Sequence, residues 1–483
     1  IHTGDVMIEK PTHFVLTAFA ALFLLPAIAS AQLKAGLSSV DVTPQVWPVT
    51  LRGSFNPKKA ESANDPLHAR SFAIRNGEGR AVITIVDILF IAQDTVDAIK
   101  AEAAKRTGWK PTEMLIAGTH THSAPSASGT GGGEAEIAFR EHLFEGVVQS
   151  IELAIENLEP ARLGFGSDEE PSEVFNRRWY LKDGTMPPNP FGGIDQVKMN
   201  PPRDLIEKPA GPTDPEVAVI SIQRANGKPM GLFANYALHY VGSIPGGQVS
   251  ADYFGEFARL VPFRIAGRTP PEDFVAMMSN GASGDINNID FAGNRAPRAP
   301  FEQIQQVATK AADAAYRATR DIEYQTDLPV GMVERRVTLK NRKPDPELIE
   351  KSKRILEMTG DELKAEPRLA SHYALRILNL ADVADTTEVA IQAIRIGDQA
   401  IVAMPFEVLV EIGLDLKKRS PFPRTTIVEI ANGAFGYLPP PHQHELGGYE
   451  TWLGTSKMEK EASVILTKHL LEMLEELKSS PLQ

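Results

Sequence analysis

Cysteine is absent from this chain of 483 residues. No disulfide can therefore form, and a thiolate is excluded both as a nucleophile and as a metal ligand. A chain of this length without disulfides must be stabilised by the packing of its core, with or without a bound metal. Any metal must be held by histidine, aspartate, glutamate or tyrosine side chains.

Runs of lysine and arginine are also absent. The 62 acidic residues outnumber the 50 basic residues, and the formal net charge is -12. Proteins that bind nucleic acids carry basic patches or stripes, so we expect no nucleic-acid partner. Hydrophobic residues make up 42% of the chain, which is enough for a large globular core.

Long apolar runs are scarce, and the one that stands out is "FVLTAFAALFLLPAIA" at residues 14–29. It is interrupted by Pro26 and is shorter than the stretch of about 20 residues that a membrane span needs. It follows Lys10 and leads into Ala29-Ser30-Ala31, a small-residue cleavage pattern. We therefore predict a signal peptide over residues 7–31 and export to the periplasm or the cell exterior, with an uncleaved anchor as the alternative. The remaining domain is predicted to cover residues 32–478.

Strand and helix patterns alternate along that domain. Apolar, β-branched runs predict strands, and apolar residues spaced by three and four predict helices. The pairs Asn226-Gly227 and Gly397-Asp398 predict the turns of two hairpins. This alternation predicts a single large α/β domain with a central mixed β-sheet flanked by helices. Strand patterns include residues 80–91, 113–120, 274–285 and 425–433, and helical patterns include residues 94–108, 138–158, 345–380 and 457–480.

Three further segments have the composition of loops. Residues 129–134 and 183–215 are rich in glycine or proline, and long irregular loops in a compact domain often form lids or the walls of binding sites. The segment "PPHQHELGG" adds His442 and His444. They form either a second metal site or part of a solvated, proline-rich loop, and the composition favours the loop.

Histidine is scarce, with 11 in the whole chain, yet His120 and His122 stand one residue apart in "LIAGTHTHSAP". They follow a predicted strand, where alternate residues share a face, so both rings can point into one site. Three other apolar runs end in His239, Glu407 and Tyr437. Ligands of open α/β sheets bind at the carboxyl ends of the strands. A catalytic zinc usually takes three His, Glu or Asp ligands and leaves one position for water, so we predict a zinc site at the carboxyl ends of these strands.

Each of these residues also has a simpler interpretation. His239 fits a hydrogen-bonded histidine of the core. Glu407 fits a carboxylate that faces the N-terminus of a helix. A pair of histidines one residue apart also occurs by chance on surfaces. Because the candidate ligands are far apart in the sequence, spacing alone does not decide between these interpretations.

The motif "GTHTHSAPS" resembles "THTHSGPGG" of the neutral/alkaline (non-lysosomal) ceramidases, which are zinc amidases that cleave the N-acyl bond of ceramide. Further segments resemble the same family in the same order, across roughly residues 35–455. "AGLSSVDVTP" is similar to the opening strand of the family, "FNRRWY" to an "NRS" element and "NYALHYVGS" to "FAVHPTSM". "MPFEVLVEIG" is similar to "PFEVTxMSG", and "IANGAFGY" with "GGYE" is similar to the pair "ANDYSGY…QYEG".

The resemblance implies Zn²⁺ as the cofactor and assigns roles to residues at the matching positions. Arg177 corresponds to a substrate-contacting arginine, with a surface ion pair as its alternative. His122 and Tyr449 are the candidates for stabilising the oxyanion, and His122 also for passing a proton to the leaving amine. Asp252 and Asp285 either orient the ligand imidazoles or act as turn and cap residues. The implied zinc ligands are His120, His239, Glu407 and Tyr437.

Two features depart from the family pattern. The glycine-rich turn "GDxSPN" of the family carries a serine, whereas "SNGASGDINN" places Asn287 at that position. An amide side chain is not a nucleophile, and Ser283 is expected to bond the local backbone, so we expect no serine mechanism. Long family members also carry a C-terminal β-sandwich domain, while this sequence ends at Gln483. We therefore expect ceramide within a bilayer to be a less secure substrate for this chain.

The sequence predicts an exported zinc-dependent hydrolase that cleaves an N-acyl amide bond with zinc-activated water. Its predicted substrate is a small-molecule or lipid amide of sphingolipid metabolism, and a peripheral contact with a membrane is compatible with this. One alternative is the same zinc site acting on a more soluble acyl-amide or ester, such as an N-acyl amino acid or a cell-wall amide. The other alternative is a non-catalytic binding protein for carbohydrate or lipid on this scaffold.

Overall fold

The structure is a computed structural model that describes residues 1–5, 7, 9, 32–129, 131–242, 244, 246–293, 295–296 and 298–480. The contacts divide the chain into Ile1–Ala31 and a large compact unit, Gln32–Gln483. Nearly all of the predicted signal peptide, residues 7–31, lies outside the described residues. None of the helices in the described part has both the length and the apolar character needed to cross a membrane.

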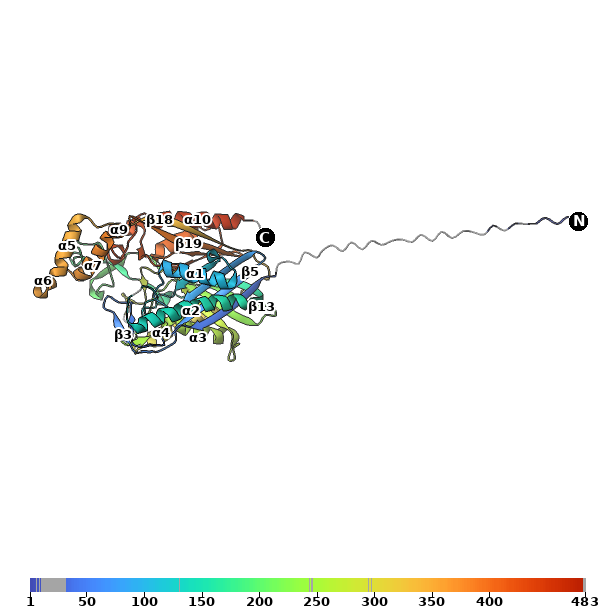
Figure 1. Ribbon diagram of the computed structural model, residues 1–483, viewed down its shortest axis with the longest axis horizontal. Helices are drawn as coiled ribbons and strands as arrows, with labels where there is room; N and C mark the ends of the chain where they lie inside the picture. Colours follow the sequence, from blue (N-terminus) through green and yellow to red (C-terminus); the bar gives the residue numbers. More distant parts are fainter. Residues whose placement is uncertain are drawn as a thin grey trace. The chain divides into compact units, whose positions relative to one another are not determined.

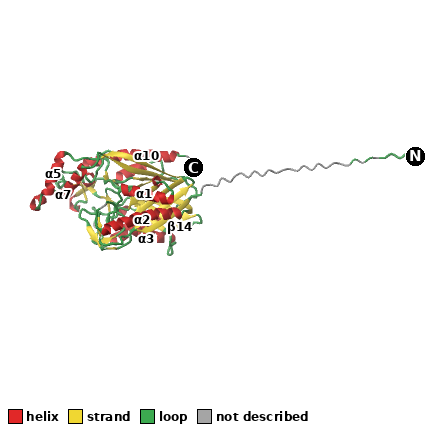
Figure 2. Ribbon diagram, in the orientation of Figure 1, coloured by secondary structure: helices red, strands yellow, loops and turns green. Residues whose placement is uncertain are grey.

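The large unit is built on a mixed sheet of eight strands in the order β16-β14-β13-β8-β1-β5-β6-β7. Figure 2 shows the strands in yellow, with helices packed around them in red. The pairs β14–β16 and β6–β7 are parallel, and the other neighbours are antiparallel. The hairpin predicted at Asn226-Gly227 is confirmed as the turn between β13 and β14. The strands are β1 (Lys34–Asp41), β5 (His68–Asn76), β6 (Gly79–Val86), β7 (Met114–Gly118), β8 (Glu159–Glu169), β13 (Glu216–Arg224), β14 (Pro229–Tyr236) and β16 (Val275–Asn280).

This sheet consists of two four-stranded halves that meet over a short ladder. β1 and β8 pair only through Lys34 with Pro160 and Ala35 with Glu159, although both strands continue well beyond this point. The halves therefore diverge, and β16 of one half contacts β1, β6 and β7 of the other half. Apolar side chains from both halves share one core, among them Phe72, Ile83, Phe233 and Met277.

A second sheet, which the sequence did not predict as a separate unit, closes this core. It has the order β18-β19-β20-β22, and the hairpin predicted at Gly397-Asp398 is confirmed as the turn between β19 and β20. Ile394, Ile401 and Val428 of this sheet pack into the core that the first sheet encloses. Its opposite face packs against α8 and α10. Figure 1 shows α10 beside β18 and β19. The strands are β18 (Val330–Lys340), β19 (Thr386–Ile396), β20 (Gln399–Ala403) and β22 (Arg424–Val428), and the helices are α8 (Val410–Arg419) and α10 (Ala462–Ser479).

Helices cover the outer faces of both halves of the large sheet, so a central mixed sheet flanked by helices is confirmed. α1 (Gln93–Thr107) and α2 (Glu134–Glu156) pack over the half that contains β1, β5, β6 and β7. α3 (Asp252–Ala266) and α4 (Glu302–Ala318), which the sequence reasoning did not predict, cover the other half. α1 ends where the sequence predicts, because Gly108 adopts the left-handed conformation at φ 73° and its amide bonds the carbonyl of Ala104.

One of the segments predicted as irregular is more ordered than predicted. Residues 183–215 contain β11 (Val197–Met199) and β12 (Ile206–Pro209), which flank β10 (Arg178–Leu181) in a small sheet. In the other segment, residues 129 and 131–133 lie in no helix or strand, and α2 begins at Glu134. The helical stretch predicted over residues 345–380 is confirmed as α5 (Pro346–Glu357), α6 (Gly360–Ala365) and α7 (Ala370–Ala381).

Candidate metal centre

The predicted ligands come together because the strands that carry them end beside one another. His120 lies two residues beyond β7, and His239 lies three residues beyond β14. The chain that leaves β22 joins these ends. The carbonyl of Ile430 accepts a hydrogen bond from the amide of Gly118 at 3.2 Å, and the residue before Ile430 donates its amide to the carbonyl of Asn280, at the end of β16. Glu407 and Tyr437 face each other in a short parallel ladder of β21 (Glu407–Val408) and β23 (Tyr437–Leu438).

Two residues at this junction have left-handed backbones. His120 has φ 67° and Ile430 has φ 52°. This conformation is unusual for any residue with a Cβ and strained for a β-branched one such as isoleucine. Strain of this kind, on the order of 1–3 kcal/mol per residue, persists where the surrounding fold enforces it and is concentrated at functional sites.

Backbone carbonyls fix the orientation of three imidazole rings. The Nδ1 atom of His120 lies 2.9 Å from the carbonyl of Leu89, and the Nδ1 atom of His122 lies 2.6 Å from the carbonyl of Gly53. The Nδ1 atom of His239 lies 3.1 Å from the carbonyl of Ser283. A carbonyl only accepts, so each Nδ1 carries the hydrogen. The Nε2 atom of each neutral ring is consequently left with a lone pair.

These lone pairs converge on one carboxylate. The Nε2 atom of His120 lies 3.3 Å from Nε2 of His122 and 3.4 Å from Oε2 of Glu407. The Nε2 atom of His239 lies 3.7 Å from the same Oε2 atom. Nitrogen and oxygen ligands about 2.1 Å from a tetrahedral ion lie about 3.4 Å apart, so the distances from His120 and His239 to Glu407 are compatible with a tetrahedral metal site.

The donor set fits a cation on two further observations. The Nε2 atom of His239 and the Oε2 atom of Glu407 are buried and have no hydrogen-bond partner among the described residues. Such atoms are costly to bury unless something compensates them. His120, His122 and His239 also offer ligand atoms that all lie within 4.8 Å of one another. The structure thus brings four candidate ligands together. Two sets of three are possible: His120, His239 and Glu407, or His120, His122 and His239. His120 and His239 belong to both sets.

The pKa values support the same conclusion. Burial lowers the pKa of His122 and of His239 well below the usual value, so both rings are neutral at pH 7 and can bind a metal. Burial also acts to lower the pKa of His120, but the carboxylate of Glu407 outweighs it and raises the pKa. In Glu407, burial raises the pKa and the positive charge of His120 lowers it, with a net decrease. The site therefore calls for one positive charge, which either a proton on His120 or a metal cation supplies.

Tyr437 and Arg177 form the next layer of the site. The guanidinium of Arg177 donates from Nη2 to the hydroxyl of Tyr437 and from Nε to Glu450, both at 2.9 Å. Arg177 is buried, so the surface ion pair considered for it is not what the structure shows. Tyr449 packs edge-to-face on Tyr437 with 5.5 Å between ring centroids, and burial raises the pKa of Tyr449 to about 12.

Sequence reasoning missed three residues that hold this arrangement. Glu429 accepts hydrogen bonds from the hydroxyl of Ser283 at 2.6 Å and from the amide of Val408 at 2.7 Å. It therefore holds in place both Ser283, whose carbonyl bonds His239, and the residue that follows Glu407. Tyr240 stacks on the ring of His122, with 3.6 Å between centroids. Glu450 accepts from both Arg177 and Arg178. Glu429 and Glu450 were visible as lone carboxylates in apolar or glycine-rich segments, but nothing in their spacing pointed to these partners.

The other sequence candidates lie close by without contacting the imidazoles. Asp285 accepts from the amide of Val410 and from Asn176, and Asp252 accepts from backbone amides that include those of Val241 and Gly242. Both therefore act as turn and cap residues, and backbone carbonyls orient the rings instead. Asn287 donates to Asn200 at 2.6 Å and accepts from the amide of Ile289.

His442 and His444 do not join the cluster. His442 is exposed and pairs with Glu411 at 2.8 Å. His444 is partly buried, and burial lowers its pKa to about 3. Across the described part of the chain, His120, His122 and His239 are the only three metal-binding side chains whose ligand atoms all lie within 4.8 Å of one another.

Two cavities border the cluster. A cavity of about 390 Å³, here called the tyrosine cavity, is lined by Glu407, Tyr437 and Tyr449 together with the apolar side chains of Phe90, Leu380 and Val383. A second cavity of about 330 Å³, here called the arginine cavity, begins at Arg177 and Tyr240 and is lined further by Arg203, Arg295 and Arg298. The tyrosine cavity is thus partly apolar, although Arg376 and Lys457 also line it, and the arginine cavity is strongly cationic.

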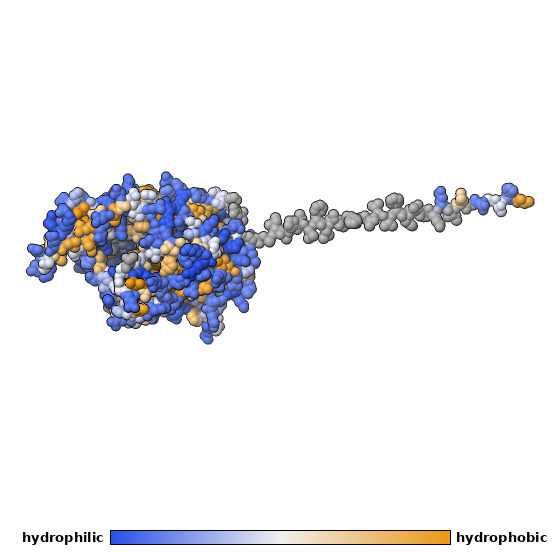
Figure 3. Space-filling model, in the orientation of Figure 1, coloured by the Kyte–Doolittle hydropathy of each residue, from blue (hydrophilic) through white to orange (hydrophobic). Residues whose placement is uncertain are grey.

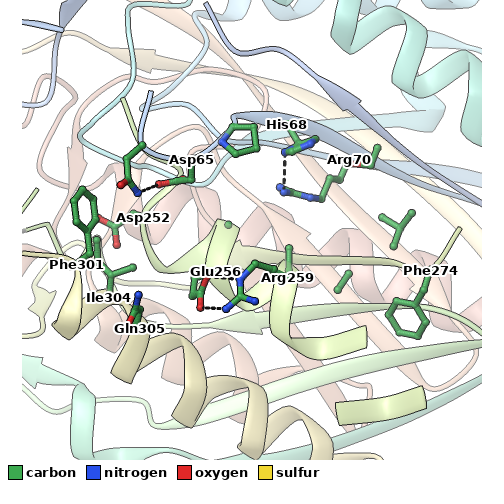
Figure 4. Close-up of a pocket in the computed structure, with 17 residues that line it drawn as sticks. Asp65, His68, Arg70, Asp252, Glu256, Arg259, Phe274, Phe301, Ile304 and Gln305 are labelled. Carbon is green, nitrogen blue, oxygen red and sulfur yellow. Dashed lines mark hydrogen bonds and ion pairs between the residues drawn. The ribbon is translucent and has the colours of Figure 1, made fainter. Parts of the chain in front are cut away.

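A third cavity, of about 320 Å³, lies elsewhere (Figure 4). It is bounded by Asp65, His68 and Arg70 on one side and by Glu256 and Arg259 of α3 on the other. Glu256 and Arg259 pair with each other. None of the predicted zinc ligands lines this cavity, so we assign the chemistry to the histidine cluster instead.

A two-sheet fold with buried histidines and a glutamate at its strand ends defines an α/β protein with a candidate metal site, and the comparisons show which family it is. The model of the neutral/alkaline non-lysosomal ceramidase family, N-terminal part, matches residues 33–296. The chain therefore belongs to this family, as the sequence motifs had implied. The matched segment contains His120, His122, Arg177 and His239, whereas Glu407 lies beyond it.

Known ceramidases are similar in sequence and in fold. The neutral ceramidase of Pseudomonas aeruginosa is 26% identical over 249 residues, which cover 46% of this chain and 34% of that protein. The match thus spans about a third of the relative's length. The crystal structure of neutral ceramidase from Pseudomonas aeruginosa superposes with a TM-score of 0.69 at 18% identity, over 94% of this chain and 76% of the other. A structure described as ceramidase complexed with C2 gives the same TM-score and coverage at 19% identity. These two likenesses establish the fold.

Proposed function

We propose that this chain is an exported, zinc-dependent amidohydrolase that cleaves the N-acyl amide bond of a lipid amide of the ceramide type. One observation carries the proposal. The Nε2 lone pairs of His120 and His239 converge on the carboxylate of Glu407 in a buried site, and no described group donates a hydrogen bond to His239 Nε2 or Glu407 Oε2. The names of the relatives described above, which are ceramidases, support ceramide as the substrate type.

Zinc is the metal that suits this donor set best. The site offers imidazole nitrogens and a carboxylate, and the chain has no cysteine that would make it a thiolate site. His120, His239 and Glu407 would hold the ion, with Tyr437 next to Glu407 as the further candidate ligand. When bound there, zinc would polarise the scissile carbonyl and lower the pKa of a water molecule to about 7.

The residues around the ligands have the properties that amide hydrolysis needs. His122 is neutral at pH 7 and presents the lone pair of Nε2, so it can accept a proton and return it to the leaving amine. Because burial holds its pKa low, the protonated ring gives the proton up readily. Tyr449, whose pKa is about 12, stays protonated and offers its O–H to the developing oxyanion. Arg177 holds Tyr437 and Glu450 in place.

The tyrosine cavity and the surface beside it support a lipid substrate. The mouth of the cavity includes Phe90 and Val383, whose side chains are 37% and 39% exposed. Leu356 on α5 and Leu375 on α7 are also exposed, and Figure 3 shows an apolar patch over these helices. We propose that the acyl chain lies in the tyrosine cavity and that this patch makes a peripheral contact with lipid.

The activity is tested with purified protein and a ceramide that carries a twelve-carbon acyl chain. We expect lauric acid to be released, the release to stop when a chelator removes the metal, and zinc to restore it. H239A and E407Q should abolish release, while D273N, at an exposed ion pair with Arg224, should leave it unchanged. A protein that carries one zinc ion per chain and releases no acid from any lipid amide would be a binding protein instead.

Export is tested by expressing the full chain in a bacterium and fractionating the cells. We expect the protein in the periplasm or medium, with a new N-terminus at Gln32, because the cleavage pattern ends at Ala31. An intact N-terminus on membrane-bound protein would instead show an uncleaved anchor.

A further inference from the structure

The arginine cavity carries a large excess of positive charge. Four arginines line it, against one carboxylate, that of Asp290. Arg203 and Arg298 have no carboxylate within 4.0 Å among the described residues. Their guanidinium groups instead donate to the carbonyl of Gly293 and to the amide oxygen of Gln303, respectively. Neither of these neutral acceptors balances the charge.

The carboxylates behind the cavity are already shared. Arg177 pairs with Glu450, which also pairs with Arg178. Arg295 pairs with Glu173 at 2.8 Å, and Glu173 also pairs with Lys310. Each of these buried carboxylates therefore serves two cations, so the wall formed by Arg177 and Arg295 keeps a net positive charge as well. A hollow lined by one sign of charge attracts and concentrates ions of the opposite sign.

This cavity opens beside the metal centre. Arg177, which bonds the hydroxyl of Tyr437, lies in its wall, and so does Tyr240, which stacks on His122. Amide side chains add hydrogen-bonding groups, because Asn200 and Asn287 line the same wall. A substrate whose amide lies at the histidine cluster can therefore extend one half into the tyrosine cavity and the other half into the arginine cavity.

We infer that the arginine cavity binds an anionic head group on the amine half of the substrate. Guanidinium groups bind carboxylates and phosphates through paired hydrogen bonds, and Arg203 and Arg298 are not engaged with any described carboxylate. The substrate class is thus an N-acyl amide with a carboxylate or a phosphate near the scissile bond. Arg203 is exposed and Arg298 is partly buried, so with a neutral head group only solvent and neutral acceptors would face their charges. This inference rests on the proposed amide hydrolysis.

Two matched pairs of substrates test it on the zinc-loaded protein. N-lauroylglycine and N-lauroylethanolamine differ in a carboxylate against a hydroxymethyl group. Ceramide 1-phosphate and ceramide differ in a phosphate. We expect kcat/KM to favour the anionic member of at least one pair, by about fivefold or more, which is the effect of one modest ion pair. The pair with the larger preference identifies carboxylate or phosphate as the head group.

Variants locate the preference. R203Q and R298Q should each raise KM for the anionic substrate by about fivefold and change KM for its neutral partner by less than twofold. R268Q is the matched control, because Arg268 is exposed and does not line the cavity. Equal or faster hydrolysis of the neutral member in both pairs overturns the inference. So does an equal effect of R203Q and R298Q on charged and neutral substrates.

A binding measurement separates this inference from the proposed function. Titration calorimetry with N-lauroylglycine and metal-free protein reads head-group binding without catalysis. If no substrate is hydrolysed but N-lauroylglycine binds, and R203Q/R298Q weakens that binding at least tenfold, the cavity assignment stands while the proposed function fails. If the protein hydrolyses N-lauroylethanolamine and ceramide but shows no binding preference for N-lauroylglycine, the proposed function stands and the inference about the arginine cavity is wrong.

Discussion

The Nε2 atom of His122 lies 3.3 Å from the Nε2 atom of His120, and both rings are held by backbone carbonyls through Nδ1. Two lone pairs at this distance repel unless a positive charge lies between or beside them. A metal ion that supplies this charge is held either by His120, His239 and Glu407 or by the three histidines. The two arrangements make different demands on His122, which is a proton carrier in the first and a metal ligand in the second.

Substitution of His122 distinguishes them. We expect H122A to retain about one zinc ion per chain after dialysis while kcat falls by about 10²–10⁴-fold, as is typical when a general acid or base is removed. H239A should lose the metal, because His239 belongs to either arrangement. Zinc per chain is measured by plasma mass spectrometry alongside the rate. Loss of zinc from H122A as complete as in H239A would show that the ion is held by three histidines.

Metal removal should lower stability, because a metal ion bound at the buried lone pairs stabilises the folded state alone. A ligand that binds the folded state alone stabilises it by about 4 kcal/mol at a free concentration a thousand times its dissociation constant. We therefore expect the denaturation midpoint to fall when a chelator is added and to recover with zinc. E407Q should show little response to either addition. A wild-type midpoint indifferent to chelator and zinc would contradict a metal at this site.

Local signals in the sequence predicted the elements that depend on local interactions. The apolar spacing of α1 and the glycine that ends it are sufficient to define that helix. The turn at Asn226-Gly227 likewise defines the hairpin of β13 and β14. The second sheet could not be predicted in this way. β20 and β22 pair in parallel across an intervening helix, and neither strand carries a signal of its partner.

The site was predictable to the extent that its side chains follow strands. His120, His239 and Glu407 each lie just beyond an apolar run, so the rule for strand ends placed them together. The groups that orient the rings are mostly backbone carbonyls, such as those of Leu89 and Gly53. Every residue has a backbone carbonyl, so the sequence does not indicate which of them bonds a histidine. The charge of the arginine cavity was hidden for a related reason, since its arginines come from three segments that are far apart in the sequence, at Arg177, at Arg203 and at residues 295–298.

The pH dependence of stability should reveal Glu429. Burial raises the pKa of Glu429 to about 8, whereas an unfolded glutamate titrates near 4.5. Between these values the folded state binds more protons than the unfolded state, so this residue makes the free energy of unfolding fall as the pH rises. Its contribution to the slope is at most about 1.4 kcal/mol per pH unit. The stability that Glu429 provides is complete below about pH 4.5 and is lost as the pH passes through about 8.

The comparison is made on metal-free protein, because metal binding has a pH dependence of its own. We expect urea denaturation of wild type to show a steeper fall in stability between pH 6 and 8 than that of E429Q, which cannot titrate. Asp252 and Asp285, whose pKa values burial raises to about 6, act mainly below this range and are common to both proteins. Identical slopes in the two proteins would mean that Glu429 titrates at an ordinary pH.

The last prediction concerns the buried link between Glu450 and two arginines. Glu450 and Arg178 are almost completely inaccessible, and their side chains pair at 2.7 Å, while Arg177 donates to the other carboxylate oxygen at 2.9 Å. Removing the charge of Glu450 leaves two buried cations without a partner. We expect E450Q to lower the free energy of unfolding by about 3–5 kcal/mol in urea denaturation. E350Q should leave it nearly unchanged, because Glu350 and its partner Lys353 are exposed to water. If E450Q is as stable as E350Q, then other groups or solvent compensate Arg177 and Arg178, and Glu450 does not hold the wall of the site.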